Sequence, residues 1–487
     1  MSIRGKFSSM NIVIVASEVT PFSKTGGLAD VAGALPKALA RLGAKVSVFS
    51  PYYPSVTQVK GLELKTKISN LPVKVGERIK IAKLYHKRQP SVDFFFVANP
   101  EYFDREYLYG TKQGDYSDNA QRFIFFSRAV LESLVQLDIK PDVLHCHDWQ
   151  SALIPLYLKT VYGQNPLYNK TKTVFTIHNL GYQGLFSAET FYDIGVPEKY
   201  SSSQGLEFYN KVNFLKSGLL YSELITTVSP TYAKEIQTKE LGFGLEGILT
   251  MHKDRLFGIL NGIDYSIWNP SKDKFIKPNY DVKTLTNKQK VKAQLSQELN
   301  LNLSPGAPLI SFIGRLARQK GIELIIAANK EITQNNAGLV ILGTGEEKYH
   351  KLLLELKAKF PKQISVNLTF NDPLAHRIYA GSDIFLIPSR YEPCGLGQMI
   401  AFKYGTIPIG FKTGGLADTI IDYSANPVTG NGFLFDTYDT DAFIKKLQKA
   451  INLYKEKDKW LKLVKKATEL DFSWQTSAQK YLKLYSN

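Results

Sequence analysis

Short, uninterrupted apolar runs alternate with helix-like segments along this chain. The first two runs are Asn11–Ser17 and Lys45–Ser50, and the stretch from about Leu28 to Leu42 between them has the pattern of a helix. Uninterrupted apolar runs of this length are typical of strands that are buried on both faces of a parallel sheet. Strand, loop, helix and strand in this order predict a doubly wound α/β fold.

The alternation continues through both halves of the chain and predicts two domains of this kind. The chain has 487 residues, too many for one core, so two domains of roughly 200–250 residues are expected. A polar, lysine-rich stretch from Ser271 to about Ser304 begins the second domain. The further predicted strands are Asp142–Cys146, Thr173–Ile177 and Glu223–Val228 in the first half, and Leu309–Ile313, Ala337–Leu342, Ile364–Phe370, Ile384–Ile387 and Ile407–Phe411 in the second.

Charge and composition limit the class of protein. Lys and Arg number 61 against 44 Asp and Glu, which gives a net charge of +17. The basic residues are spread over many segments without a nucleic-acid recognition motif, so solvated helix faces explain them better than a nucleic-acid surface. No apolar run of about 18 residues and no secretory signal is present. The two cysteines, Cys146 and Cys394, indicate a reduced compartment. We therefore expect a cytoplasmic protein whose residues 1–10 are a flexible leader, or sequence that lies upstream of a start at Met10.

The stretch Pro388–Gln398 is the strongest candidate for a functional site. It follows the predicted strand Ile384–Ile387 and leads into a helix-like segment, so it lies where open α/β sheets bind their ligands. Glu392 stands in this turn, and Gly395 and Gly397 allow a ligand to approach the backbone. A carboxylate beside the anion-favouring start of a helix predicts a substrate with hydroxyl groups and phosphate, such as a nucleotide sugar.

Two cations follow the first predicted strand of the second half. Arg315 and Lys320 lie five residues apart across a strand-to-helix turn. Arginine as a planar fork and lysine as a point charge are suited to bind one diphosphate together. Two ordinary surface cations are the alternative, and the glycine at the strand end favours phosphate binding.

One seven-residue stretch occurs twice. Lys24–Asp30 and Lys412–Asp418 are identical, and each follows an apolar strand. The repeat suggests two similar α/β halves whose glycine loops face a shared cleft. The first loop is not the GxGxxG dinucleotide motif, which argues against a nicotinamide enzyme.

Polar residues follow successive predicted strands of the first half. Asp148 and His178 each stand just after a strand, as the open-sheet rule expects of a site. A metal cluster of His145, His147, Asp148 and His178 is an alternative, but the tight spacing of metal ligands is missing. His178 is better explained as the partner of a substrate hydroxyl, with a satisfied core histidine as the other possibility.

Two further stretches have a functional and a simpler explanation. The segment Glu101–Asn119 is rich in aromatic, carboxylate and amide side chains, which suits sugar binding and an ordinary packed loop about equally. Asp439-Thr-Asp441 has the DxD spelling that holds a divalent ion in some transferases. It precedes a helix-like segment, so helix capping explains it more simply. No metal ion or other cofactor is therefore expected.

Taken together, these motifs resemble those of bacterial glycogen synthases and plant starch synthases. The resemblance runs from about Asn11 to the C-terminus and implies the GT-B fold, two Rossmann-like domains that face a central cleft. The expected extents are 11–262 on the acceptor side, 263–470 on the donor side, and a segment 471–487 that packs back on the first domain. The matching stretches are Lys24–Val31, Glu101–Asn119, His145–Trp149, Thr176–Leu180, Asn261–Asp264, Gly314–Leu316, Gln319–Gly321, Ala375–Asp383, Glu392–Leu396 and Thr413–Leu416, and the anchors of the last segment would be Trp474, Tyr481 and Tyr485.

The resemblance implies a retaining glucosyltransferase that needs no metal. Glucose would move from ADP-glucose to the non-reducing 4-hydroxyl of an α-1,4-glucan such as glycogen or starch. Cations would neutralise the leaving diphosphate, Glu392 would stabilise the donor glucose, and Phe370 would contact the adenine. The implied catalytic residues are Glu392, His178, Arg315, Lys320 and Asp148; the donor-binding residues are Lys24, Gly27, Asn261, Arg315, Lys320, Phe370, Cys394, Gly395 and Leu396; and the acceptor-binding residues are Asp148, Asn179 and Tyr182.

The chain departs from the family pattern at three positions. Ile400 stands where related transferases often carry a second glutamate, Gly397 replaces a frequent threonine, and Phe370 replaces the usual tyrosine. These departures bear on donor affinity and base preference, so UDP-glucose is the alternative donor. A catalytically inactive glucan-binding protein is the alternative from another class, and the joint presence of the family's charged and histidine residues argues against it.

Overall fold

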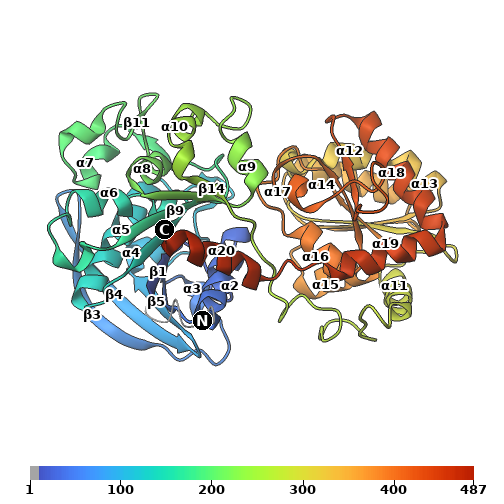
Figure 1. Cartoon of the computed structure of the whole chain (residues 1–487), viewed down its shortest axis with the longest axis horizontal. Helices are drawn as coiled ribbons and strands as arrows, with labels where there is room; N and C mark the ends of the chain where they lie inside the picture. The colour runs from blue at the N-terminus through green and yellow to red at the C-terminus, as the bar shows by residue number, and fades with distance from the viewer. Residues whose placement is uncertain (1–9, 487) are drawn as a thin grey trace. The chain divides into compact units, whose positions relative to one another are not determined.

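The computed structural model describes residues 10–486, which form two compact units (Figure 1). Unit 1 contains the chain up to Gly262 together with the segment from Trp474, and unit 2 runs from Ile263 to Ser473. The leader expected over residues 1–10 lies outside the described residues except for Met10. Each unit is a doubly wound α/β unit around a largely parallel sheet, so the predicted fold class is confirmed. Within residues 10–486, no helix is both long and apolar enough to cross a membrane.

Unit 1 is built on a sheet with the strand order β14-β13-β9-β8-β1-β2-β5-β4-β3. From β14 to β5 all neighbours run parallel, as predicted for the apolar runs that form β1, β2, β8, β9 and β13. Strands β5 and β14 were not predicted. β4 pairs antiparallel with β3 and β5. Neither β3 nor β4 was predicted, because their few buried residues are interspersed with many lysines. The strands are β1 (Asn11–Val15), β2 (Lys45–Pro51), β3 (Lys65–Val75), β4 (Arg78–Gln89), β5 (Val92–Ala98), β8 (Val143–His147), β9 (Lys172–Ile177), β13 (Leu224–Thr227) and β14 (Leu256–Gly258).

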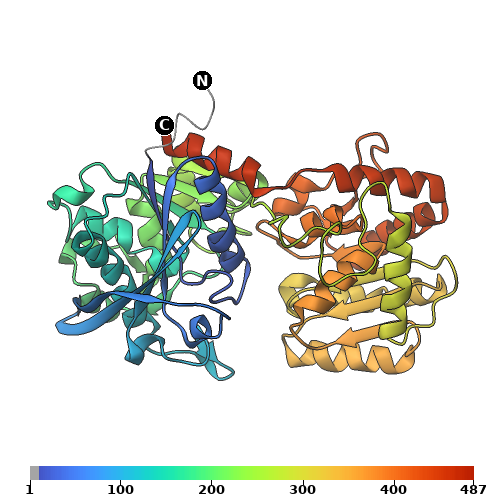
Figure 2. The same cartoon turned by 90° about the horizontal axis from the view of Figure 1, so that it is seen from below.

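Helices α2 (Gly27–Arg41) and α20 (Trp474–Ser486) pack together in unit 1 and share a core with alternate residues of β1, β2 and β5. Figure 2 shows α20, in red, beside α2, in blue. Trp474, Tyr481 and Tyr485, which were expected to anchor the C-terminal segment, are buried in this core. The C-terminal segment was expected to begin at residue 471. The part that belongs to unit 1 begins at Trp474, where α20 starts.

The remaining elements of unit 1 include two small antiparallel sheets, β10-β12-β11 and β6-β7. The elements are α3 (Pro54–Thr57), α4 (Pro100–Phe103), α5 (Asn119–Gln136), α6 (Ile154–Lys159), α7 (Thr190–Ile194), α8 (Phe214–Tyr221), α9 (Pro230–Glu235), α10 (Glu246–Met251), β6 (Gly110–Thr111), β7 (Gly114–Asp115), β10 (Leu185–Ser187), β11 (Glu207–Phe208) and β12 (Lys211–Asn213).

Unit 2 is a parallel sheet with the order β17-β16-β15-β18-β19-β20 and helices in the crossover connections. The short strand β20 was not predicted. The strands are β15 (Leu309–Ile313), β16 (Gly338–Leu342), β17 (Ile364–Asn367), β18 (Ile384–Ile387), β19 (Ile407–Phe411) and β20 (Phe433–Phe435). The helices are α11 (Thr286–Glu298), α12 (Ile322–Ala327), α13 (Asn329–Gln334), α14 (Glu347–Lys359), α15 (Asp372–Gly381), α16 (Gly397–Lys403), α17 (Gly414–Thr419), α18 (Thr440–Lys455) and α19 (Lys457–Glu469).

Candidate active site

The carboxylate of Glu392 is the centre of the candidate site in unit 2. It lies in the turn between β18 and α16 and is only 8% exposed. One of its oxygens accepts hydrogen bonds from Lys320 Nζ at 2.5 Å and from Ser389 Oγ at 2.8 Å. The turn therefore fixes an acidic group beside a cation at the carboxyl edge of the sheet, where ligands of such sheets bind.

Two turns are joined so that Lys320 reaches Glu392. Arg390 donates its backbone N–H to the carbonyl of Gln319 at 2.8 Å, and the Gln319 side chain donates to the carbonyl of Tyr391 at 3.1 Å. Gly321 has φ of +68°, and a Cβ there would lie 2.0 Å from the carbonyl oxygen of Pro388. A glycine is therefore required where the loop after β15 meets the loop after β18.

The other donor residues expected in unit 2 lie in loops at the same edge of the sheet. Arg315 follows β15 and is exposed. Phe370 follows β17 and exposes 72% of its surface, although it is a large apolar residue. The next residue, Asn371, caps α15 by accepting a hydrogen bond from the Leu374 N–H at 2.9 Å, so the backbone beside Phe370 is fixed. An exposed ring on a fixed backbone is suited to stack on a planar ligand.

The second copy of the repeated stretch, Lys412–Asp418, packs against the backbone of the Glu392 turn. Gly415 donates its N–H to the carbonyl of Glu392 at 3.1 Å, and a Cβ on Gly415 would lie 1.8 Å from the carbonyl oxygen of Cys394. Gly397, one of the departures from the family pattern, packs against Phe385, whose ring carbon would lie 2.9 Å from a Cβ at this position. These glycines make room for protein atoms, and the turn with Cys394, Gly395 and Leu396 is thereby held in place.

The first copy of the repeat is arranged differently in unit 1. Lys24 Nζ pairs with Asp30 at 2.9 Å across the start of α2. Among the described residues, and apart from the adjoining backbone, no atom lies within 4 Å of a Cβ built on Gly26 or Gly27. The two identical stretches therefore have different surroundings, and only the first leaves space for a ligand at its glycines.

Glu18 holds this first loop, and the sequence analysis missed it. The buried carboxylate accepts hydrogen bonds from the N–H groups of Thr25 and Gly26 and from the Thr25 hydroxyl, and it contacts the Tyr109 hydroxyl at 3.3 Å. Burial raises the pKa of the Glu18 carboxyl above its ordinary value. A charged residue three positions after the apolar strand β1 was the available signal, because such a residue needs partners when it is buried.

Asp148 has a strained backbone in unit 1. Its φ of 55° and ψ of 179° lie in a region that is almost restricted to glycine. Its carboxylate accepts a hydrogen bond from the backbone N–H of His178 at 2.7 Å, which ties the ends of β8 and β9 together. Desolvation is the largest cause that raises the pKa of Asp148 from 3.8 to about 7, and the nearby Glu18 adds to the increase.

His178 lies beside a second histidine. His147 Nδ1 and His178 Nε2 are 2.9 Å apart, and the His147 ring lies 4.2 Å from the ring of His145. Burial lowers the pKa of both His145 and His178 to about 3, so both rings are neutral at physiological pH. His145 bonds to Thr176 and Tyr485. The structure does not bring these histidines into a metal-binding group within residues 10–486.

The remaining unit 1 residues named from the sequence differ in exposure. Asn261 is buried, and within the described part of the chain its Oδ1 has no hydrogen-bond partner. Asn179 uses its Oδ1 to accept a hydrogen bond from the Gly181 N–H at 3.0 Å. Tyr182 exposes 51% of its surface. An acceptor atom of Asn261 is therefore available to a ligand.

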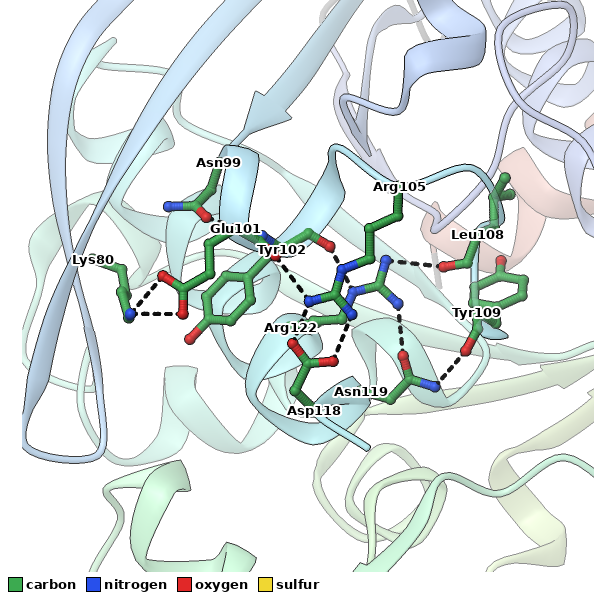
Figure 3. A network of polar contacts seen from close by, with 10 residues as sticks. All are labelled: Lys80, Asn99, Glu101, Tyr102, Arg105, Leu108, Tyr109, Asp118, Asn119 and Arg122. Atoms are coloured by element: carbon green, nitrogen blue, oxygen red, sulfur yellow. Dashed lines mark hydrogen bonds and ion pairs between the residues drawn. The ribbon is translucent and has the colours of Figure 1, made fainter. Parts of the chain in front are cut away.

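The segment Glu101–Asn119 mainly serves internal packing (Figure 3). The guanidinium of buried Arg122 donates to the carbonyls of Tyr102 at 2.7 Å and Leu108 at 2.9 Å and to Asn119 Oδ1 at 2.6 Å. The role of Arg122 was not predicted, and its hydrogen bonds favour the packed-loop explanation for most of this segment.

In unit 2, Asp439 accepts a hydrogen bond from the Ala442 N–H at 2.7 Å, which confirms that the DxD stretch caps α18.

Replacing Asp148 with asparagine is expected to change how stability depends on pH. In the wild type the folded state keeps this proton up to about pH 7, whereas the unfolded state loses it near 3.8. Stability is therefore lost as pH rises between these values, and the loss is complete above 7. Asparagine keeps the acceptor oxygen, tolerates the positive φ and carries no charge. The melting temperature of Asp148→Asn minus that of the wild type is expected to increase from pH 4 to 7 and then to level off. A difference that is constant over this range contradicts the assignment.

Comparison with known proteins places the two units in a class. Residues 11–251 match the family model of the starch synthase catalytic domain, and residues 296–467 match that of glycosyl transferases group 1. Two doubly wound units with these matches define a glycosyltransferase of the GT-B class. The chain belongs, within that class, to the glycogen synthase and starch synthase family, and the resemblance seen in the sequence is confirmed.

Three relatives illustrate the likeness. The glycogen synthases of Geotalea daltonii and Syntrophotalea carbinolica are each 47% identical, and the match covers 98% of this chain and 98% of each relative. The catalytic domain of starch synthase IV from Arabidopsis thaliana, solved with ADP and acarbose bound, superposes with a TM-score of 0.92 at 35% identity. That superposition covers 98% of this chain and 99% of the starch synthase chain.

Proposed function

We propose that the protein transfers glucose from ADP-glucose to the non-reducing 4-hydroxyl of an α-1,4-glucan, with retention of anomeric configuration. Membership of the glycogen synthase and starch synthase family supports the glucan acceptor. The observation that carries the proposal is the Glu392 carboxylate held beside Lys320 and Ser389. In glycosyl transfer, positive charge develops on the sugar and negative charge on the leaving diphosphate. A fixed carboxylate beside a fixed cation therefore stabilises both partners of the separating charge.

Arg315 and Lys320 are proposed to neutralise the leaving diphosphate. An ammonium group has three N–H donors, and Glu392 uses one of those on Lys320. Within the described residues this ammonium has no other hydrogen-bond acceptor, so the remaining donors are available to phosphate oxygens. Arg315 adds a planar fork from the same loop. Charge neutralisation by these side chains does not require a metal ion, so we propose that the reaction proceeds without one. Lys24 and Gly27 of unit 1 are assigned to the same donor.

We assign neutral groups of the protein to the glucose and the adenine of the donor, and a further set of residues to the acceptor. His178 is neutral at physiological pH because of its lowered pKa, so it hydrogen-bonds a hydroxyl without adding charge beside the developing cation. Asn261 supplies its available oxygen, and the backbone from Cys394 to Leu396 borders the glucose. The exposed ring of Phe370 is assigned to the adenine, and the ADP in the starch synthase structure supports this base. Asp148, Asn179 and Tyr182 are assigned to the acceptor.

The donor assignment predicts that the protein prefers ADP-glucose to UDP-glucose, and one assay measures this preference. Radiolabelled glucose incorporation into glycogen is followed with ADP-glucose and UDP-glucose at equal concentrations, with and without EDTA. Strong incorporation from ADP-glucose is expected, with UDP-glucose slower and EDTA without effect. Release of the label by an exo-acting hydrolase specific for α-1,4 links tests retention and linkage. Incorporation only from UDP-glucose contradicts the donor. Loss of activity in EDTA contradicts the metal-free reaction. Glycogen binding without incorporation from either donor indicates a binding protein instead.

A further inference from the structure

Three loops of unit 1 that contact one another carry aromatic residues, most of them exposed. We define the aromatic patch as Tyr182, Phe208, Tyr209 and Phe243. Tyr209 is 76% exposed, Tyr182 51% and Phe243 39%. Tyr182 lies between β9 and β10, Phe208 and Tyr209 lie at the β11–β12 hairpin, and Phe243 precedes α10. β11 and α10 are labelled next to each other in Figure 1.

Specific contacts hold the three loops together. The rings of Phe208 and Tyr209 meet edge to face with centroids 4.7 Å apart. Gly244 lies against both, since a Cβ there would be 2.9 Å from the Phe208 ring and 3.4 Å from the Tyr209 ring. The Gln183 side chain donates to the carbonyl of Phe243 at 3.1 Å. The loops are therefore built as one surface.

The backbone of the patch is strained at its aromatic residues. Tyr209 has φ of 49° and Phe243 has φ of 51°, values that are outliers for bulky residues. Asn210, between Tyr209 and β12, has φ of 60°, which asparagine adopts more readily. Strained conformations persist only where the surrounding structure fixes them, and they cluster at functional sites. Here the strain presents rings to solvent, where they contribute little to the hydrophobic core.

The patch is continuous with the loop that carries Asp148. The next residue, Trp149, packs its indole against Gly184, where a Cβ would lie 2.5 Å from the ring. Gly184 adjoins Gln183, which bonds to Phe243 as described above. A chain of direct contacts therefore runs from Asp148 through Trp149 and Gln183 to the aromatic patch.

We infer that the aromatic patch binds an α-glucan chain at sugar units away from the end that reacts. The inference rests on the proposed function, which places the acceptor end near Asp148 and Tyr182. A glucan is a polymer, so its chain extends beyond the reacting end, and a surface continuous with Asp148 lies in its path. The flat apolar faces of glucose rings stack on aromatic rings, and neutral sugars need no charged partner. Phe208, Tyr209 and Phe243 therefore favour long acceptors over short ones.

Asparagine substitutions test the patch with little change in the backbone. Tyr209→Asn and Phe243→Asn remove the rings and keep a residue that tolerates positive φ. Tyr192→Asn, in α7 of the same unit, is the matched control, since Tyr192 is 71% exposed outside the patch. Electrophoresis in gels that contain glycogen measures binding without requiring catalysis. Each patch variant is expected to bind glycogen about tenfold more weakly, which is a change of one power of ten in the dissociation constant. The control is expected to bind normally.

Kinetics separates a subsite from a general defect. The KM for glycogen is expected to rise in the patch variants, while kcat with maltotriose and the KM for the nucleotide sugar stay unchanged. Unchanged binding to glycogen overturns the inference. So does a variant that loses nucleotide-sugar affinity, or one whose main change is in oligomeric state, because the patch is then a structural element or an interface between copies. If the wild type transfers no glucose but the patch variants still lose glycogen binding, the proposed function fails and the glucan site stands.

Discussion

Replacing Glu392 with glutamine is expected to lower kcat for glucose transfer by about 10²–10³-fold. The carboxylate is nearly buried and is fixed by Lys320 and Ser389. Glutamine has the same shape and can still accept the hydrogen bond from Ser389, but it carries no negative charge to stabilise the sugar cation that forms as the donor bond breaks. The KM for ADP-glucose is expected to change much less than kcat, because the charge that the carboxylate stabilises develops mainly in the transition state.

A matched substitution in the same unit controls for loss of charge. Glu323 also forms an ion pair, with Arg390 at 2.7 Å, and both side chains are more exposed than that of Glu392. Glu323→Gln is expected to keep kcat and melting temperature near those of the wild type, because exposed ion pairs contribute little to stability. If both variants keep normal turnover, Glu392 is a structural residue of the turn. If both fall equally, the effect comes from the charge of the unit and not from the position of Glu392.

Much of the fold was predictable because its information is local. Most parallel strands of both units are uninterrupted apolar runs, and such runs are recognisable without knowing their neighbours. The parallel strands β5, β14 and β20 were missed. β3 and β4 were missed because they lie at one end of the sheet, where few of their residues are buried and several of the others are lysines. The pattern of an edge strand is therefore close to that of a polar loop.

Candidate site residues could be proposed from the sequence only where they follow from strand ends. That rule singled out Glu392, Lys320 and Asp148, because each lies in a segment that follows a buried strand. It did not reveal that Glu18 binds the loop of the first repeat, or that Asp148 has a glycine-like backbone, since both depend on partners distant in sequence. Contacts between residues far apart in the sequence determine the hydrogen bonds of Glu18 and the backbone of Asp148, and a single sequence does not reveal which residues make those contacts.

The repeated stretch shows that identical sequences can have different tertiary surroundings. Lys24–Asp30 and Lys412–Asp418 are identical and both begin a helix, so their local structure is shared. The glycines of the first are open, whereas Gly415 of the second packs against the carbonyl of Cys394. The expectation that both glycine loops face a ligand therefore stays a prediction for the first loop, whereas the glycines of the second pack against protein atoms. What lies against a glycine is set by the tertiary fold.

Replacing Lys320 with glutamine is expected to reduce kcat/KM for ADP-glucose by about 10²–10³-fold. Lys320 is assigned to the leaving diphosphate, whose negative charge increases as the bond to glucose breaks. Glutamine keeps a hydrogen-bond donor and much of the length but removes the positive charge. Arg318→Gln is the matched control, since Arg318 is an exposed cation two residues away in the same loop. It is expected to keep normal kinetics.

Inhibition by nucleotides tests whether Lys320 acts through the second phosphate. The wild type is expected to bind ADP more tightly than AMP, because the diphosphate reaches the cations. Lys320→Gln is expected to weaken ADP binding by about 10–100-fold, the value of a hydrogen bond to a charged group, and to leave AMP binding nearly unchanged. Equal weakening of both nucleotides means that the substitution disturbs the Glu392 turn as a whole. Unchanged binding of both places the diphosphate elsewhere, and Lys320 then serves only to hold the carboxylate of Glu392, with which it shares a 2.5 Å contact.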